Sequence, residues 1–206
     1  NSMLVTIPIN LQSQQNVEFY SPDDLEATKT VDINISTVLF DERGCNYTIK
    51  TPTSNGTSAK LDYKGNQGGS RRFYSKRVTL SEGTNRIEVT CAPLTTPSFK
   101  TVIVDTIGPT QIPTIDANEN TCSLSRLQAT LKNGTDTRNG SGFDYFEYNI
   151  TLQGDTENAY SFYGETQGSI SKDISRFKNI SGKVYTIKAW SVDNAGNKGA
   201  ATTKPI

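Results

Sequence analysis

The sequence predicts an all-β protein built from two tandem β-sandwiches, and three observations lead to this prediction. The chain has 206 residues, close to twice the roughly 100 that one seven-stranded sandwich needs. Short runs in which apolar and polar residues alternate recur along the chain and are separated by turn residues. Only 33% of the residues are hydrophobic, which suits a sandwich because each strand buries only every second side chain.

The first half contains enough strand-like runs for one sandwich. In the clearest run, Val31, Ile33 and Ile35 alternate with polar residues, as expected for a half-buried strand. Turns are expected at Lys64–Ser70 and at Glu82-Gly83. Together these patterns predict strands near residues 17–20, 31–35, 45–49, 60–63, 72–80, 87–91 and 101–105.

Residues 106–113, with the sequence TIGPTQIP, are expected to join the two sandwiches. The two prolines of this segment cannot donate backbone hydrogen bonds to a sheet, and they hold the chain extended. We therefore place the boundary near Gly108 and predict domains at residues 1–107 and 108–206.

The second half repeats the rhythm of the first. Phe, Tyr, Ile and Leu at the even-numbered positions of residues 146–152 predict a strand face that points into the core. The turn at Gly83 before Ile87 has a counterpart at Gly182 before Ile187, roughly 100 residues later, which indicates a repeat of architecture. Strands are expected near residues 124–131, 146–152, 160–163, 170–177, 185–189 and 200–204, with a loop at 133–142.

Charge and composition exclude several classes of function. Lysine plus arginine equals aspartate plus glutamate, at 21 each, so no net field attracts nucleic acid. No apolar run approaches the roughly 18 residues of a transmembrane helix, so we expect no membrane insertion of this segment. The chain has no histidine, which removes the commonest general base and every Ser-His or Cys-His pair. We therefore expect no catalytic residues and no enzyme.

Two stretches resemble known families. Leu80–Pro93 (LSEGTNRIEVTCAP), followed by Thr101–Thr110 (TVIVDTIGPT), resembles the end of a bacterial Ig-like domain. Ser141–Ile150 (SGFDYFEYNI), with Lys183–Gly199 (KVYTIKAWSVDNAGNKG), resembles the fibronectin-type-III-like modules of bacterial surface and secreted proteins. The resemblance implies two tandem immunoglobulin-like (Ig/Fn3) β-sandwiches joined by a short proline-containing linker. It also implies a location outside the cell or at its surface, with the periplasm as an alternative.

This resemblance implies a non-catalytic structural or adhesion module, which would be a stalk, spacer or ligand-binding segment of a larger bacterial surface protein. The expected partners are a protein or glycan ligand at the cell surface and further domains of the same polypeptide. The alternative is a pair of accessory modules of a secreted carbohydrate-active or proteolytic enzyme whose catalytic domain lies outside this chain. Because such folds carry no function by themselves, the choice depends on particular residues.

The cysteines offer the first such residues. Cys45 opens one expected strand, Cys91 ends another, and each has inward parity within its run. In this topology the two strands are antiparallel neighbours, so we expect a disulfide, which would indicate an oxidising compartment. The alternative is two buried free thiols. Cys122 remains; we expect it to be buried and unreactive, and the alternative is a partner outside this chain.

Trp190 is the only tryptophan, and it is expected to point outward. The inward parity of its run belongs to the Tyr, Ile and Ala at positions 185, 187 and 189, which leaves Trp190 and Lys188 on the other face. The neighbouring strand should turn Tyr145 to the same face. Such residues can stack on a sugar ring or anchor a protein partner, so Trp190, Tyr145 and Lys188 form a candidate ligand-binding patch. The alternative is a tryptophan covered by its neighbours.

The segment Asp193–Asn197 (DNAGN) offers oxygen ligands in a tight turn, and Asp105 precedes the linker. Calcium needs six to eight oxygens, however, and no EF-hand spacing occurs. An Asx-type turn, with Gly196 at positive φ, accounts for the same residues. We therefore expect no cofactor and no metal, with calcium as the alternative.

Asparagine also begins seven Asn-x-Ser/Thr triplets. In a eukaryotic secreted protein these would indicate glycans. A chain rich in Asn, Ser and Thr generates several by chance, and the family resemblance is bacterial, so we interpret them as composition. The triplets begin at Asn34, Asn46, Asn55, Asn133, Asn139, Asn149 and Asn179.

Overall fold

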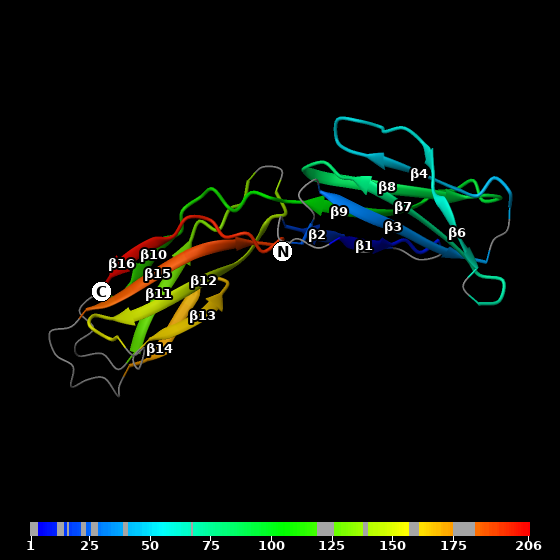
Figure 1. Ribbon diagram of the computed structural model, residues 1–206. Helices are drawn as coiled ribbons and strands as arrows, with labels where there is room; N and C mark the ends of the chain where they lie inside the picture. Colours follow the sequence, from blue (N-terminus) through cyan, green and yellow to red (C-terminus); the bar gives the residue numbers. More distant parts are fainter. Residues whose placement is uncertain are drawn as a thin grey trace. The chain divides into compact units, whose positions relative to one another are not determined.

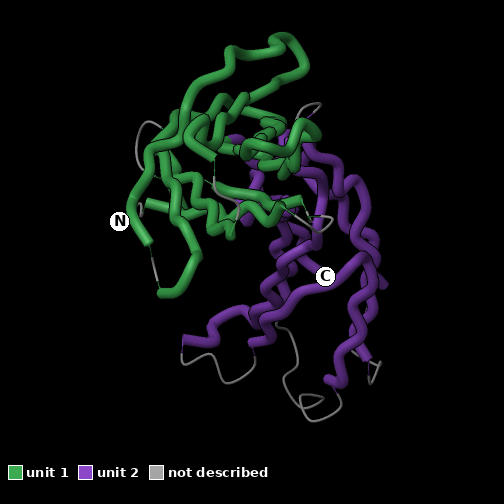
Figure 2. Tube along the Cα trace, turned by 90° about the vertical axis from the view of Figure 1, so that its right-hand side faces the viewer, with its two compact units in different colours: residues 1–106 green, residues 107–206 purple. Residues whose placement is uncertain are grey.

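The structure, a computed structural model, confirms the all-β fold. It describes residues 4–11, 15, 17–21, 24–25, 29–38, 41–66, 68–118, 126–137, 140–156, 161–174 and 184–206. These residues form 16 strands, and no helix occurs among them, so no described helix can cross a membrane. The chain divides into two compact units, residues 1–106 and 107–206, which Figure 2 shows in green and purple.

The first unit consists of a four-stranded and a five-stranded sheet (Figure 1). The four-stranded sheet has the order β1 (Val5–Pro8), β3 (Thr30–Thr37), β7 (Arg72–Thr79), β6 (Asp62–Asn66). The five-stranded sheet has the order β2 (Glu18–Tyr20), β9 (Ser98–Val104), β8 (Gly83–Cys91), β4 (Cys45–Lys50), β5 (Ala59–Lys60). The edge strands β1 and β2 pair in parallel with β3 and β9, whereas the other neighbours are antiparallel.

The core of the first unit lies between these two sheets. Val31, Ile33 and Ile35 are completely buried, which confirms the inward parity predicted for this run. They pack in one apolar cluster with residues of the other sheet, among them Ile87 and Val102. Burying these apolar side chains between two sheets is the main source of stability in such a fold.

The second unit has a three-stranded and a four-stranded sheet. The smaller sheet has the order β10 (Thr114–Ala117), β11 (Arg126–Lys132), β14 (Ser169–Asp173). The larger has the order β13 (Phe162–Thr166), β12 (Phe143–Leu152), β15 (Tyr185–Asp193), β16 (Thr202–Pro205). The predicted inward faces are confirmed, because every one of these side chains is buried in a single cluster: Phe146, Tyr148, Ile150, Leu152, Tyr185, Ile187 and Ala189.

Four short strands differ from the expectation. Strands β1 and β10 were not expected, since each has only four residues and too short an alternation to be detected. The strand expected at residues 60–63 is divided between β5 and β6, which belong to different sheets. Buried Leu61 lies between them, and its N–H donates to the Cys45 carbonyl over 2.9 Å. The turn expected at Lys64–Ser70 starts later, because β6 continues to Asn66.

The carboxylate of Glu82 stabilises the C-terminal end of the first unit. Glu82 accepts hydrogen bonds from the Thr106 backbone N–H at 2.8 Å and from the Thr106 hydroxyl at 2.9 Å. Lys29 adds an ion pair with Glu82 at 2.8 Å. Burial alone would raise the pKa of Glu82, but the hydrogen bonds from Lys29 and Thr106 outweigh it and hold the pKa below the ordinary value of 4.5.

This lowered pKa predicts a pH-dependent contribution to stability. A carboxylate with a lowered pKa in the folded state stabilises the fold above its ordinary pKa, and this stabilisation is lost as the pH falls through the folded-state pKa. We expect Glu82→Gln to lower the unfolding temperature of the first unit at pH 7, and the difference from wild type to shrink towards pH 3. Thermal unfolding across this range measures it; a difference independent of pH would contradict the prediction.

Candidate functional site

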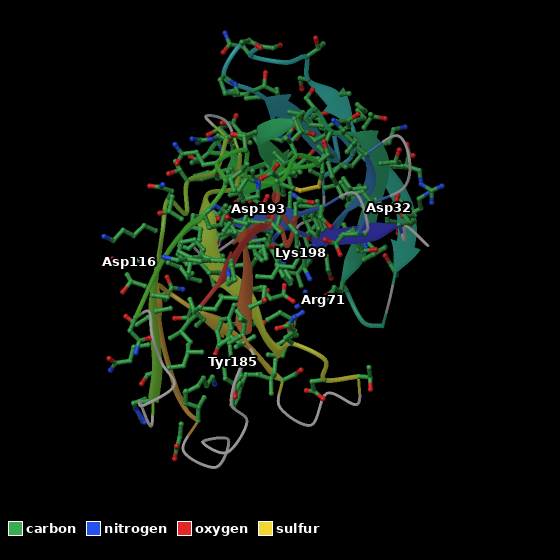
Figure 3. All side chains as sticks on the ribbon, turned by 90° about the vertical axis from the view of Figure 1, so that its left-hand side faces the viewer. Asp32, Arg71, Asp116, Tyr185, Asp193 and Lys198 are labelled. Carbon is green, nitrogen blue, oxygen red and sulfur yellow. A yellow bond between two sulfur atoms is a disulfide. The ribbon has the colours of Figure 1, made fainter. Side chains whose placement is uncertain are left out.

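The predicted disulfide is present in the first unit. Cys45 and Cys91 are direct partners on the antiparallel strands β4 and β8, with Cα atoms 4.0 Å and sulfur atoms 2.03 Å apart. Both residues are 2% exposed and belong to the apolar core, and Figure 3 shows the bond in yellow. The bond therefore links two strands of one sheet from its inner face. Cys122 lies outside the described residues.

The predicted patch residues lie on the outer face of the β13-β12-β15-β16 sheet. Trp190 on β15 stands directly opposite Glu147 on β12, and Lys188 stands opposite Asn149. Tyr145 lies two residues before Glu147, after a register shift between Phe143 and Tyr145 that leaves the parity of Tyr145 unchanged. One sheet face thus presents all three patch residues, as strand alternation requires.

Trp190 belongs to a cluster of charged side chains. Its indole N–H donates to Glu147 Oε2 over 3.2 Å, and Lys198 Nζ lies 2.8 Å from the same oxygen. The ammonium groups of Lys198 and Lys188 lie 5.2 and 5.8 Å from the centre of the indole ring, within the range of cation–π attraction. Neighbouring side chains therefore cover part of the ring, as the alternative interpretation of Trp190 supposed, while the ring still faces outward.

Glu147 is the centre of this cluster. Although it has outward parity, it is only 3% exposed, because Trp190 and Lys198 lie over it. A buried carboxylate is costly unless it is paired and hydrogen-bonded. Glu147 meets both conditions, and it fixes the position of the indole.

Tyr145 borders the same cluster. Burial raises the pKa of the Tyr145 hydroxyl, and the nearby carboxylates of Glu165 and Glu147 raise it further, whereas Lys198 acts in the opposite direction. An ordinary tyrosine hydroxyl is already protonated at neutral pH and can donate a hydrogen bond, and this environment only makes it harder to ionise.

The turn at residues 193–197 has the Asx-type geometry. Asp193 Oδ1 accepts the backbone N–H groups of Ala195 and Asn197, each at 2.9 Å, and Gly196 has a φ of 89°. Asn194 Nδ2 donates to the Ser141 carbonyl over 2.9 Å, which ties the turn to the segment before β12. The turn leads the chain back beside β15, where Lys198 pairs with Val192 and reaches Glu147 (Lys198 is labelled in Figure 3).

Sequence reasoning missed two members of this surface. Tyr163 on β13 stands opposite Asn149 and is 62% exposed, the most exposed of the described large apolar or aromatic side chains. Lys198 follows the DNAGN turn and was not associated with Trp190. The register of β13 and β12 brings Tyr163 to this face, and the turn at residues 193–197 brings Lys198 there. The signal for Tyr163 was its position in an expected strand. We call the following set the Trp190 face: Tyr145, Glu147, Tyr163, Lys188, Trp190 and Lys198.

No protein-family model and no curated protein sequence match this chain. Among solved structures it is similar to the FN1-FN3 domains of chicken CNTN1, with a TM-score of 0.51 and 12% identity, over 97% of this chain and 66% of that chain. Two others have lower TM-scores. The CD2-binding domain of CD58 has a TM-score of 0.32 and 10% identity, over 93% of this chain and 96% of that chain. The Yersinia pseudotuberculosis adhesin InvE has a TM-score of 0.27 and 12% identity, over 91% of this chain and 56% of that chain.

The likeness to the chicken segment concerns the fold alone, because the identity is low, and this chain spans just under two thirds of that segment. The strand order supports the same assignment. In the second unit, the β10-β11-β14 sheet faces the β13-β12-β15-β16 sheet across one apolar core. The chain is therefore an all-β protein with an Ig/Fn3-like fold.

Proposed function

We propose that this chain is a non-catalytic structural and adhesion module of a secreted or cell-surface protein. The observation that carries the proposal is the buried Cys45–Cys91 disulfide within an Ig/Fn3-like fold. Structural disulfides form and persist mainly in oxidising compartments, so the bond favours an extracellular location. The family resemblance of the sequence supports a stalk, spacer or binding segment of a larger bacterial surface protein.

The Trp190 face is the part of the chain best suited to bind a partner. It combines an exposed tyrosine, a half-buried tryptophan and lysine side chains on and beside one sheet. Aromatic side chains dominate the energetics of many interfaces, and ordered ones lose little entropy on binding. The proposed ligand is a protein or a glycan at the cell surface, held at Tyr163 and Lys188 beside the ordered indole of Trp190.

A binding measurement with matched variants tests this face. We expect Tyr163→Ala and Lys188→Ala to weaken the binding of the whole chain to cells or to a glycan array, with a loss of about thirtyfold for Tyr163→Ala, as for a hot-spot residue. Tyr63→Ala is the matched control, because Tyr63 is 51% exposed but lies on β6 of the first unit. If Tyr63→Ala weakens binding as much as Tyr163→Ala, or if wild type does not bind, the binding role of the Trp190 face is contradicted and only the spacer role remains.

The second candidate is a pair of accessory modules beside a secreted carbohydrate-active or proteolytic domain. The proline-containing connection between the units and the absence of histidine from the chain fit this role as well. Sequence adjoining this chain distinguishes the two: a hydrolase domain favours the accessory role, and further sandwich repeats favour the stalk.

A further inference from the structure

We propose that Asn55 and Asn133 are acceptor sites for N-linked glycans. The inference rests on the export proposed above, because this modification is made on proteins that leave the cytosol. It replaces the interpretation of the triplets as composition, and it requires a source organism with an oligosaccharyltransferase rather than the bacterial source that the resemblance implies. The sequence has seven Asn-x-Ser/Thr triplets, whereas its 17 asparagines and 46 serines and threonines would produce about four by chance. Because this excess is modest, the positions of the triplets in the fold carry the argument.

Every described triplet asparagine lies outside the two cores. Three of them occupy half-buried, outward positions in strands: Asn34 on β3, Asn46 on β4 and Asn149 on β12. The other two, Asn55 and Asn133, are exposed and lie in segments that connect strands, not within a strand. A bulky, polar glycan needs such surface positions.

Asn55 lies in a segment that the fold presents to solvent. All residues from Pro52 to Lys60 are exposed, and the turn before Asn55 is closed by a 2.8 Å hydrogen bond from the Thr51 N–H to the Ser54 carbonyl. Gly56 has a φ of 68°, and a Cβ there would lie 2.2 Å from a backbone oxygen. The turn thus requires the glycine of the triplet.

Asn133 has an equivalent setting directly after β11. It is exposed, with a φ of 67°, a conformation that asparagine adopts more readily than most residues. Its amide nitrogen has one long contact of 3.5 Å with the Thr114 hydroxyl, which a glycan would displace at little cost. A Cβ on Gly134 would lie 2.4 Å from the Phe143 ring, so this turn also requires its glycine.

Turn geometry therefore explains Asn-Gly in both triplets but does not explain the threonines. Thr57 and Thr135 are exposed, and no hydrogen bond among the described residues uses either hydroxyl. A hydroxyl two residues after the asparagine is the feature that the glycan-transferring enzyme requires.

The triplet at Asn34, which lies within strand β3, differs from the triplets at Asn55 and Asn133. Asn34 Oδ1 accepts a hydrogen bond from Ser75 Oγ at 2.7 Å, and Ser36, the third residue of that triplet, accepts one from Arg71 at 3.2 Å. A glycan on Asn34 would disturb this hydrogen bond, whereas glycans on Asn55 and Asn133 leave both sheets intact.

The modification is a group transfer from a lipid-linked oligosaccharide phosphate, catalysed by a separate oligosaccharyltransferase. The new bond joins asparagine Nδ2 to the anomeric carbon of the first sugar. The bond from that carbon to the phosphate oxygen breaks, its electron pair leaves on the phosphate, and Nδ2 gives up one proton. No oxidant or reductant takes part.

Secretion of the whole chain from cultured animal cells, behind an export signal, tests the proposal. Enzymatic release of glycans in ¹⁸O-labelled water marks each occupied asparagine, and peptide mass spectrometry locates the marks. We expect marks at Asn55 and Asn133. Thr57→Ala should remove only the first and Thr135→Ala only the second, while Thr57→Ser and Thr135→Ser, which keep the hydroxyl, should retain them.

The same peptides are analysed from chain that stays inside the cells, so that poor secretion of a variant does not decide the result. Unmarked Asn55 and Asn133 in a chain that carries the Cys45–Cys91 bond would overturn the glycan sites and leave the proposed function standing. Marks confined to the strand triplets would overturn them as well. Three free thiols in the secreted chain would instead contradict the proposed function.

Discussion

Removing the Cys45–Cys91 disulfide is expected to destabilise the first unit by about 4 kcal/mol, because the bond closes a loop of 46 residues in the unfolded chain. The double variant Cys45→Ala/Cys91→Ala tests this. Its two alanines keep the positions apolar, which matters because both cysteines are buried in the core. Denaturant unfolding should show a lower midpoint for the first unit.

Two controls belong to this experiment. Cys122→Ala keeps the disulfide and should leave the transition of the first unit unchanged. Wild type that is unfolded without reductant should expose one free thiol, that of Cys122. After reduction, the unfolded wild type should expose three free thiols. A double variant as stable as wild type would show that the bond adds nothing to the stability of this fold.

Phe146→Ala is expected to cost the second unit about 4 kcal/mol, since truncating a buried phenylalanine loses its burial and leaves a cavity. Phe146 is 2% exposed, and its ring lies 4.8 Å from that of Phe143, in a tilted aromatic pair. The free energy of unfolding from denaturant titration of the second unit measures the effect.

Thr151→Ala is the matched control for Phe146. Thr151 lies on the same strand, β12, but is exposed on the opposite face. We expect it to change stability by less than about 0.5 kcal/mol, as surface substitutions usually do. If both substitutions cost the same, the assignment of the inward face of β12 would be wrong.

Strand parity was predictable because it is a local property. The alternation at Val31, Ile33 and Ile35 and the inward face of β12 appear in the sequence with period two, and burial confirms them. The Cys45–Cys91 pairing followed from the same parity together with the expected neighbourhood of the two strands. The domain boundaries at residues 1–107 and 108–206 stay a prediction, for which separate expression of the two segments is the direct measurement.

The short strands could not be predicted, because hydrogen-bonded pairing with a neighbouring strand stabilises them and their own sequences carry no recognisable pattern. Four residues such as those of β1 or β10 carry too little alternation to be recognised, yet each gains a full set of ladder partners on β3 or β11. The division of residues 59–66 between two sheets depends on Leu61 entering the core. Nothing in the local pattern indicates that the chain changes sheets there.

The all-β class and the inward strand faces followed from the sequence alone, since they depend on short-range alternation and on turns. The disulfide followed from the same parity together with the expected pairing of its two strands. The Trp190 face depended on the tertiary structure. From the sequence alone, Glu147 would be taken for an ordinary exposed residue. Tyr163 lies far from Trp190 along the chain, and Lys198 is separated from Trp190 by a turn. Only the registers of β13, β12 and β15 and the turn at Asp193 bring these side chains together and bury the carboxylate among them.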